Sequence, residues 1–145
     1  MVTRKIIAAV FIIIAIVLGV IFYMQLEFPI GLEAYFKKAF YGQFGPLAIC
    51  IELLIAGFYL FVKHPKSNFT LALFGFTALL DPIFNTIGLF TSSVPAYGMV
   101  LFIICSLLAL WLAFSNAFKM GRLSLIGVVV SFILGLAVEL FFNYL

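Results

Sequence analysis

The sequence predicts an all-helical membrane protein in which five transmembrane helices form a bundle and one amphipathic helix lies at the outer membrane surface. Of the 145 residues, 67% are hydrophobic and only 9% are charged, and the mean hydropathy is +1.36. Water-soluble chains contain roughly 45–50% apolar and about 25% charged residues. This chain therefore has too few polar side chains to cover a compact particle in water. Its apolar residues also form long runs separated by short polar breaks.

Five apolar runs are long enough to cross a bilayer, which takes about 20 mostly apolar residues in a helix. The predicted spans are residues 5–24, 46–62, 69–90, 97–118 and 123–145. The first run follows two basic residues but has no A-x-A cleavage site, so we expect a retained anchor helix. Lys119 and Arg122 separate the last two spans, because placing both charges in hydrocarbon would be costly.

The basic residues predict the orientation of the bundle. With the N-terminus in the cytoplasm, the residues on the inner side are Arg4, Lys5, Lys63, Lys66, Lys119 and Arg122. Only Lys37 and Lys38 then lie outside. This bias predicts a cytoplasmic N-terminus and an outside C-terminus in a cytoplasmic (inner) membrane.

Residues 31–44 have the pattern of an amphipathic helix. The apolar residues at helical spacing are Leu32, Tyr35, Phe36, Ala39, Phe40 and Phe44. Glu33, Lys37 and Lys38 fall on another face. The helix is expected to lie in the outer interface or to pack over the mouth of the bundle, since an apolar stripe fits either surface.

Three carboxylates inside the predicted spans are the residues most indicative of function. Glu52, Asp81 and Glu139 lie about 9 to 14 Å from the outer ends of their helices, counted at 1.5 Å per residue. A charge at mid-helix costs roughly 2.5–3.5 kcal/mol to insert. No lysine or arginine lies at the same depth. The carboxylates are therefore expected to face water, hold protons or bind a cation, and mutual repulsion should keep at least one of them protonated at neutral pH.

Polar and small residues continue from these carboxylates along single helix faces. Steps of four residues connect Thr77, Asp81 and Asn85 in the third span and Gly127, Ser131, Gly135, Glu139 and Asn143 in the fifth. Tyr59 follows Glu52 by seven residues on the second span. We predict one ligand-binding pocket formed by Glu52, Tyr59, Thr77, Asp81, Asn85, Glu139 and Asn143. The alternative is that the glycine and serine positions only allow close helix packing.

Pro82 predicts a disturbance of the third span, because proline lacks a backbone donor and crowds the preceding turn. Two outcomes fit this residue. The helix can continue with a kink, or Asp81 can cap a second half-helix at the kind of break where transporters bind ions.

Several classes of function do not fit the residues. His64, Cys50 and Cys105 are too few for a bis-histidine haem, a four-ligand zinc site or an iron–sulfur cluster within this chain, so no cofactor is expected. Both cysteines are expected to pack as small apolar residues. The basic residues form no stripe for nucleic acid. Phosphate-binding loop, nucleophile-elbow, H-E-x-x-H and C-x-x-C motifs are absent.

The sequence thus favours binding or transport of a cation, a proton or a lipophilic amine by outward-facing carboxylates, without catalysis. One alternative is a non-catalytic subunit of a larger membrane complex, in which basic residues of other subunits would pair the carboxylates. A weaker alternative is an intramembrane isomerase that uses two carboxylates as acid and base. Besides the lipid bilayer, further copies of the chain or other membrane subunits are the expected partners.

Overall fold

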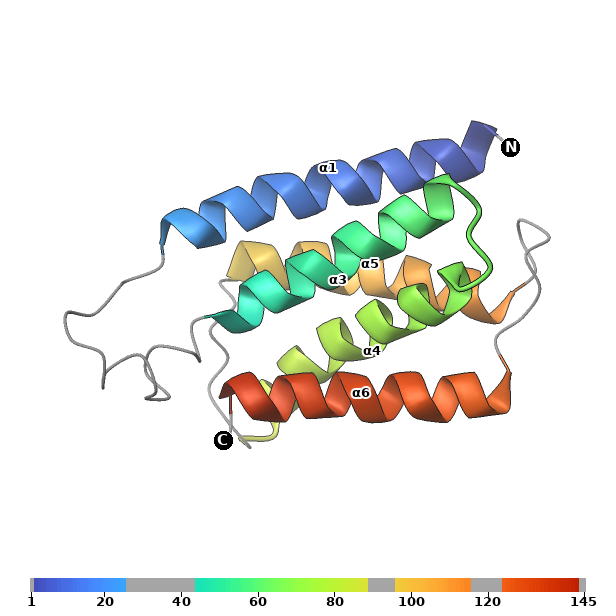
Figure 1. Cartoon of the computed structure of the whole chain (residues 1–145). Helices are drawn as coiled ribbons and strands as arrows, with labels where there is room; N and C mark the ends of the chain where they lie inside the picture. Colours follow the sequence, from blue (N-terminus) through green and yellow to red (C-terminus); the bar gives the residue numbers. More distant parts are fainter. Residues whose placement is uncertain (1, 26–43, 89–95, 116–123, 144–145) are drawn as a thin grey trace, which may run out of the picture.

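The computed structural model describes residues 2–25, 44–88, 96–115 and 124–143, which form five α-helices (Figure 1). The helices are α1 (Val2–Met24), α3 (Gly45–Phe61), α4 (Ser67–Thr86), α5 (Ala96–Phe114) and α6 (Leu125–Asn143). No strand occurs within these ranges, so the all-helical class is confirmed for this part of the chain. The predicted amphipathic helix over 31–44 lies, apart from its last residue, outside the described residues.

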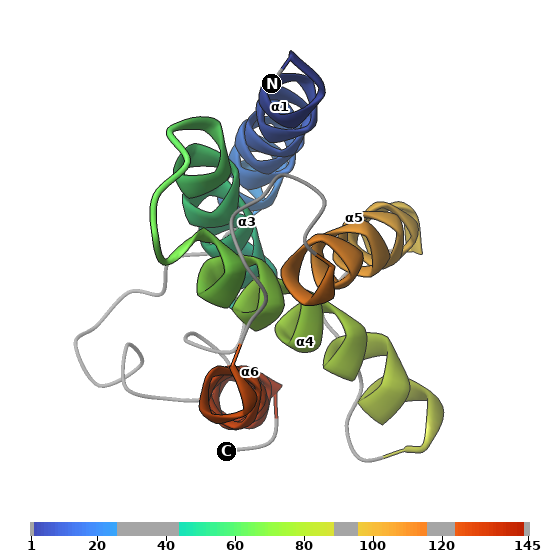
Figure 2. The ribbon, with the colours of Figure 1, turned by 90° about the vertical axis from the view of Figure 1, so that its right-hand side faces the viewer.

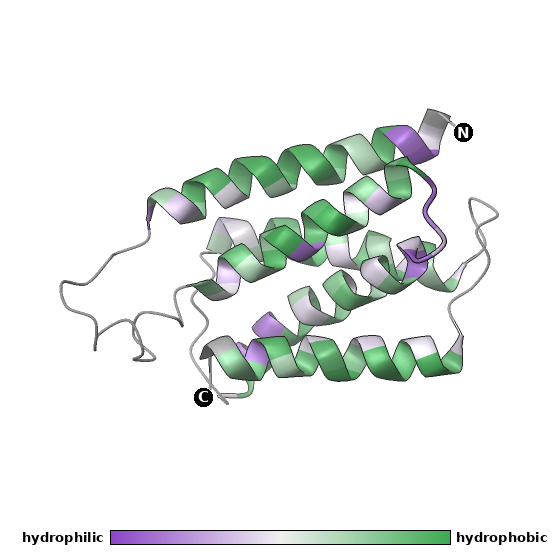
Figure 3. Ribbon diagram, in the orientation of Figure 1, coloured by the Kyte–Doolittle hydropathy of each residue, from purple (hydrophilic) through white to green (hydrophobic). Residues whose placement is uncertain are grey.

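Three of these helices, α1, α4 and α5, are long and apolar enough to cross a membrane. α3 and the apolar part of α6, Leu125–Phe141, are shorter. Most of the helical ribbon is hydrophobic (Figure 3). Ile13, Ile104 and Trp111 are each more than half exposed. These properties are those of a membrane protein, and three of the five predicted spans have the length and composition that a span requires.

The helix α4 is the centre of the bundle. It packs against α3, α5 and α6, and α1 packs mainly against α3. Seen along the bundle, α1 and α6 lie on opposite sides of the molecule (Figure 2). Consecutive helices run in opposite directions, so α4 and α6 run the same way, and the start of α1 lies at the same end as the turn between α3 and α4 (Figure 1).

Two glycines allow neighbouring helices to approach closely. A Cβ atom at Gly57 of α3 would lie 2.9 Å from the Ile12 side chain and 3.2 Å from the Ala8 carbonyl oxygen of α1. At Gly75 of α4 it would lie 2.6 Å from the Leu110 side chain of α5. Small residues at such contacts are typical of helix packing in membranes.

A left-handed residue ends α3. Lys63 has φ 56°, its N–H donates to the Leu60 carbonyl at 3.3 Å, and the N–H of His64 donates to the Tyr59 carbonyl at 2.9 Å. This is the Schellman pattern of helix termination, and Pro65 prevents the helix from continuing. The imidazole of His64 stacks on the Tyr59 ring with centroids 4.2 Å apart.

Pro82 does not interrupt α4. The helix continues through it to Thr86, whose hydroxyl donates to the Pro82 carbonyl at 2.7 Å. The alternative in which Asp81 caps a second half-helix is therefore wrong. Membrane helices tolerate an internal proline when neighbouring groups satisfy the freed backbone. α4 ends one turn later, where Gly88 adopts φ 84°.

Candidate functional site

The small residues of α6 face α4 and bring the two helices into register. A Cβ atom at Gly135 would lie 2.9 Å from the Thr77 hydroxyl oxygen and 3.1 Å from the Thr77 backbone nitrogen. Ser131, one turn earlier, is fully buried and donates its hydroxyl to the Val128 carbonyl at 3.0 Å. Because α4 and α6 run in the same direction, one further turn on each helix brings Glu139 to Asp81.

The carboxyl groups of Asp81 and Glu139 are hydrogen-bonded to each other. Both residues are buried, each with an exposed fraction of 2%. An ionised carboxylate can only accept hydrogen bonds, so a hydrogen bond between two carboxyl groups requires a proton on one of them. One proton shared by Asp81 and Glu139 would satisfy this contact.

Glu52 reaches the same place from α3. Its carboxyl group is hydrogen-bonded to the Thr77 hydroxyl and interacts electrostatically with Glu139. The Thr77 hydroxyl donates to the Leu73 carbonyl at 2.8 Å. The Thr77 hydroxyl group thus contacts both the Leu73 carbonyl and the Glu52 carboxyl group, and it links α3 to α4. The remaining carboxyl oxygen, Oε2, is buried and has no hydrogen-bond partner within the described part of the chain.

We call Glu52, Asp81 and Glu139 the carboxyl cluster. Three helices contribute to it, and α4 supplies both Asp81 and the linking hydroxyl of Thr77. Burial penalises each ionised carboxylate, and the close spacing adds mutual repulsion. Protons or a bound cation would relieve both costs.

Of the three other residues predicted for this pocket, the structure describes the side chains of two. Tyr59 stacks on His64 at the end of α3, about 10 Å along the helix axis from Glu52. Asn85 is exposed, one turn beyond Asp81. The side chain of Asn143 lies outside the described residues.

Sequence reasoning missed the Leu73 carbonyl, which orients the Thr77 hydroxyl. A threonine inside a helix often donates to the carbonyl four residues earlier. This common hydrogen bond was the signal in the sequence that could have indicated the contact between Thr77 and Leu73.

Comparisons of the chain with protein-family models, with curated proteins and with solved structures find no match. Within the described ranges, no group of three or more His, Cys, Asp or Glu side chains has the arrangement of a metal site.

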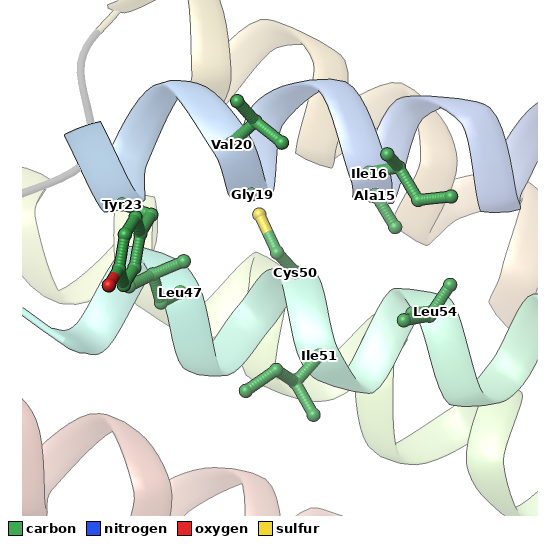
Figure 4. A pocket seen from close by; sticks show the side chains of 9 residues that line it. All are labelled: Ala15, Ile16, Gly19, Val20, Tyr23, Leu47, Cys50, Ile51 and Leu54. Atoms are coloured by element: carbon green, nitrogen blue, oxygen red, sulfur yellow. The ribbon is translucent and has the colours of Figure 1, made fainter.

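Two apolar hollows lie away from the carboxyl cluster. One, of about 320 Å³, is a groove between α1 and α3 with Ala15, Gly19 and Cys50 among its lining residues (Figure 4). The other, of about 310 Å³, involves Pro82 of α4 and Ile103 of α5. Both cysteines are buried free thiols. Neither hollow includes a carboxylate.

Proposed function

We propose that the chain binds or transports a cation, either inorganic or a lipophilic amine, in exchange for a proton at the carboxyl cluster. The pairing of two buried carboxyl groups, those of Asp81 and Glu139, is the observation that carries this proposal. When its proton leaves, two buried negative charges face each other, with Glu52 close to Glu139. A cation that takes the place of the proton restores the charge balance.

The exchange is a proton transfer and needs no other covalent change. The O–H bond of the pair breaks, the proton passes to water, and one positive charge enters between the two carboxylates. The net charge of the site is unchanged when one monovalent cation replaces one proton. Glu52 then supplies an additional acceptor, because its Oε2 atom makes no hydrogen bond in the described part of the chain.

The proposed topology is a five-span bundle with the N-terminus in the cytoplasm, the C-terminus outside and the chain in the inner membrane. α3 and α6 have 17 and 19 residues. At 1.5 Å per residue they are about 26 and 29 Å long, close to the hydrocarbon thickness of about 30 Å. The end that carries Arg4, Lys5, Lys63 and Lys66 is then the cytoplasmic one. Asp81 and Glu139 lie toward the opposite, outer end of their helices.

The proposal is tested by cation binding to the purified full-length protein in neutral detergent, with tetraphenylphosphonium and Na⁺ as probes between pH 5 and 9. Binding of at least one probe should strengthen as the pH rises, because protons compete with it. Asp81→Asn should abolish this dependence while the helical content stays unchanged. Glu33→Gln, which removes a carboxylate outside the predicted spans, is the matched control. Binding that is the same in wild type and Asp81→Asn would contradict the assignment.

A further inference from the structure

Basic residues of α1 and of the α3–α4 turn gather at one end of the bundle, where the ribbon of both segments is hydrophilic (Figure 3). The guanidinium of Arg4 donates to the carbonyls of Leu60 and Phe61 at 2.5 and 2.6 Å. The ammonium of Lys5 lies 5.7 Å from the centroid of the Phe61 ring. The first turn of α1 is thereby held against the last turn of α3.

The backbone of the α3–α4 turn is fixed as well, and it presents two further lysines. Lys63 occupies the left-handed position of the helix cap, and the backbone N–H of Lys66 donates to Nδ1 of His64 at 3.0 Å. The N–H of Ser67 donates to the His64 carbonyl at 3.0 Å and begins α4. Lys63 and Lys66 are both exposed.

Arg4 and the lysines have different roles at this end. Arg4 has an exposed fraction of only 6%, and its guanidinium neutralises the carbonyl end of α3, where the helix dipole is negative. Lys5, Lys63 and Lys66 are exposed and form what we call the lysine rim. The acidic residues of the described ranges lie elsewhere, in the carboxyl cluster. The lysine rim therefore offers three positive charges to an outside partner.

The surface directly beside the lysine rim is apolar. Ile6, Phe61 and Val62 have exposed fractions of 57%, 41% and 51%. A ligand that satisfies both surfaces needs a negative head and an apolar tail. We propose that the lysine rim binds the phosphate headgroup of an anionic phospholipid, with its acyl chains against Ile6, Phe61 and Val62. A soluble phosphate would match the charge but would leave the apolar residues uncovered. This inference does not depend on the function of the carboxyl cluster.

The test is native mass spectrometry of the full-length protein released from mixed micelles of a neutral detergent and phospholipid. Phosphatidylglycerol and phosphatidylcholine with identical acyl chains are compared. The wild type should retain phosphatidylglycerol at least about tenfold better than phosphatidylcholine, since each basic residue near anionic lipid contributes about a fivefold gain in binding. K63Q/K66Q should lose this preference. K37Q/K38Q removes the same charge from the predicted outer segment and should keep it.

Three results would overturn the inference. Equal retention of both lipids by the wild type would show that the headgroup charge is not recognised. Loss of the preference in K37Q/K38Q to the same degree would assign it to net charge instead of the lysine rim. Displacement of phosphatidylglycerol by an equal concentration of glycerol 3-phosphate would identify a site for soluble phosphate. Circular dichroism of each variant confirms that it is folded.

Discussion

Thr77 shows how much of the site depends on a single side chain. Its hydroxyl group is hydrogen-bonded to the Leu73 carbonyl and to the Glu52 carboxyl group, and its backbone faces Gly135. Three helices therefore meet at one residue. Changes at or beside Thr77 should consequently affect packing and the carboxyl cluster together.

Gly135→Ala should destabilise the protein by about 1–3 kcal/mol, because the new methyl group would press α6 away from α4. The Cβ atom would lie 2.9 Å from the Thr77 hydroxyl oxygen and 3.1 Å from its backbone nitrogen. Unfolding in mixed micelles titrated with dodecyl sulfate measures the change. Gly19→Ala is the control, since its Cβ atom would meet only Cys50, at an ordinary distance of 3.8 Å. Equal stability of the two variants would show that the close approach of α4 and α6 is unimportant.

Lys63→Val should unfold more easily than Lys63→Gly, by about 1–2 kcal/mol, because a β-branched residue is strained in the left-handed region and glycine is not. Lys63 has φ 56° and ends α3. The same detergent titration distinguishes the two variants. If both unfold at the same point, the helix does not end in a left-handed residue.

At the scale of the elements, Arg4 ties α1 to α3. Arg4→Met keeps much of the apolar stem but removes the donors to the Leu60 and Phe61 carbonyls, and is expected to cost about 1–3 kcal/mol of stability. Lys5→Met removes an equal charge from an exposed position and should change stability by less than about 0.5 kcal/mol. A loss of stability in Lys5→Met as large as in Arg4→Met would contradict the role of these hydrogen bonds. Detergent-titrated unfolding again gives both values.

The sequence predicts the elements better than their mutual arrangement. The predicted span 46–62 coincides with α3 to within a residue at each end, because apolar runs bounded by proline and basic residues mark helix ends in membranes. The four-residue spacing along α6 also predicted that its small residues and Glu139 lie on one face of the helix. The rotation of each helix about its axis and the identity of its neighbours depend on packing between helices. The pattern of residues along a single helix does not predict either of them. The central place of α4 could not be predicted for this reason.

One wrong prediction, for Tyr59, and one alternative left open, at Pro82, have the same physical origin. Tyr59 shares a helix face with Glu52 but lies two turns along the axis, where the α3–α4 turn supplies His64 as its neighbour. The continuity of α4 at Pro82 depends on how surrounding groups satisfy the freed backbone, and those groups belong to other parts of the fold.

At the scale of the whole molecule, the carboxyl cluster joins α3, α4 and α6, and we propose that it holds a proton. If the chain acts by itself, these groups are satisfied internally, and the protein extracted in a mild detergent should run alone or as a homo-oligomer. The mass of the extracted particle and the identity of co-purifying chains test this expectation. Stoichiometric co-purification of other subunits would instead support the alternative of a non-catalytic subunit, whose carboxylates meet basic residues of a partner.

The proposed sharing of a proton between Asp81 and Glu139 is the central claim, and infrared spectroscopy of the purified protein tests it most directly. At neutral pH we predict absorption from protonated carboxylic acid that shifts in D₂O. The absorption should weaken when a bound cation displaces the proton, and the contribution of the pair should be missing in Asp81→Asn. A spectrum with ionised carboxylates only, identical in wild type and variant apart from the lost aspartate, would contradict the account.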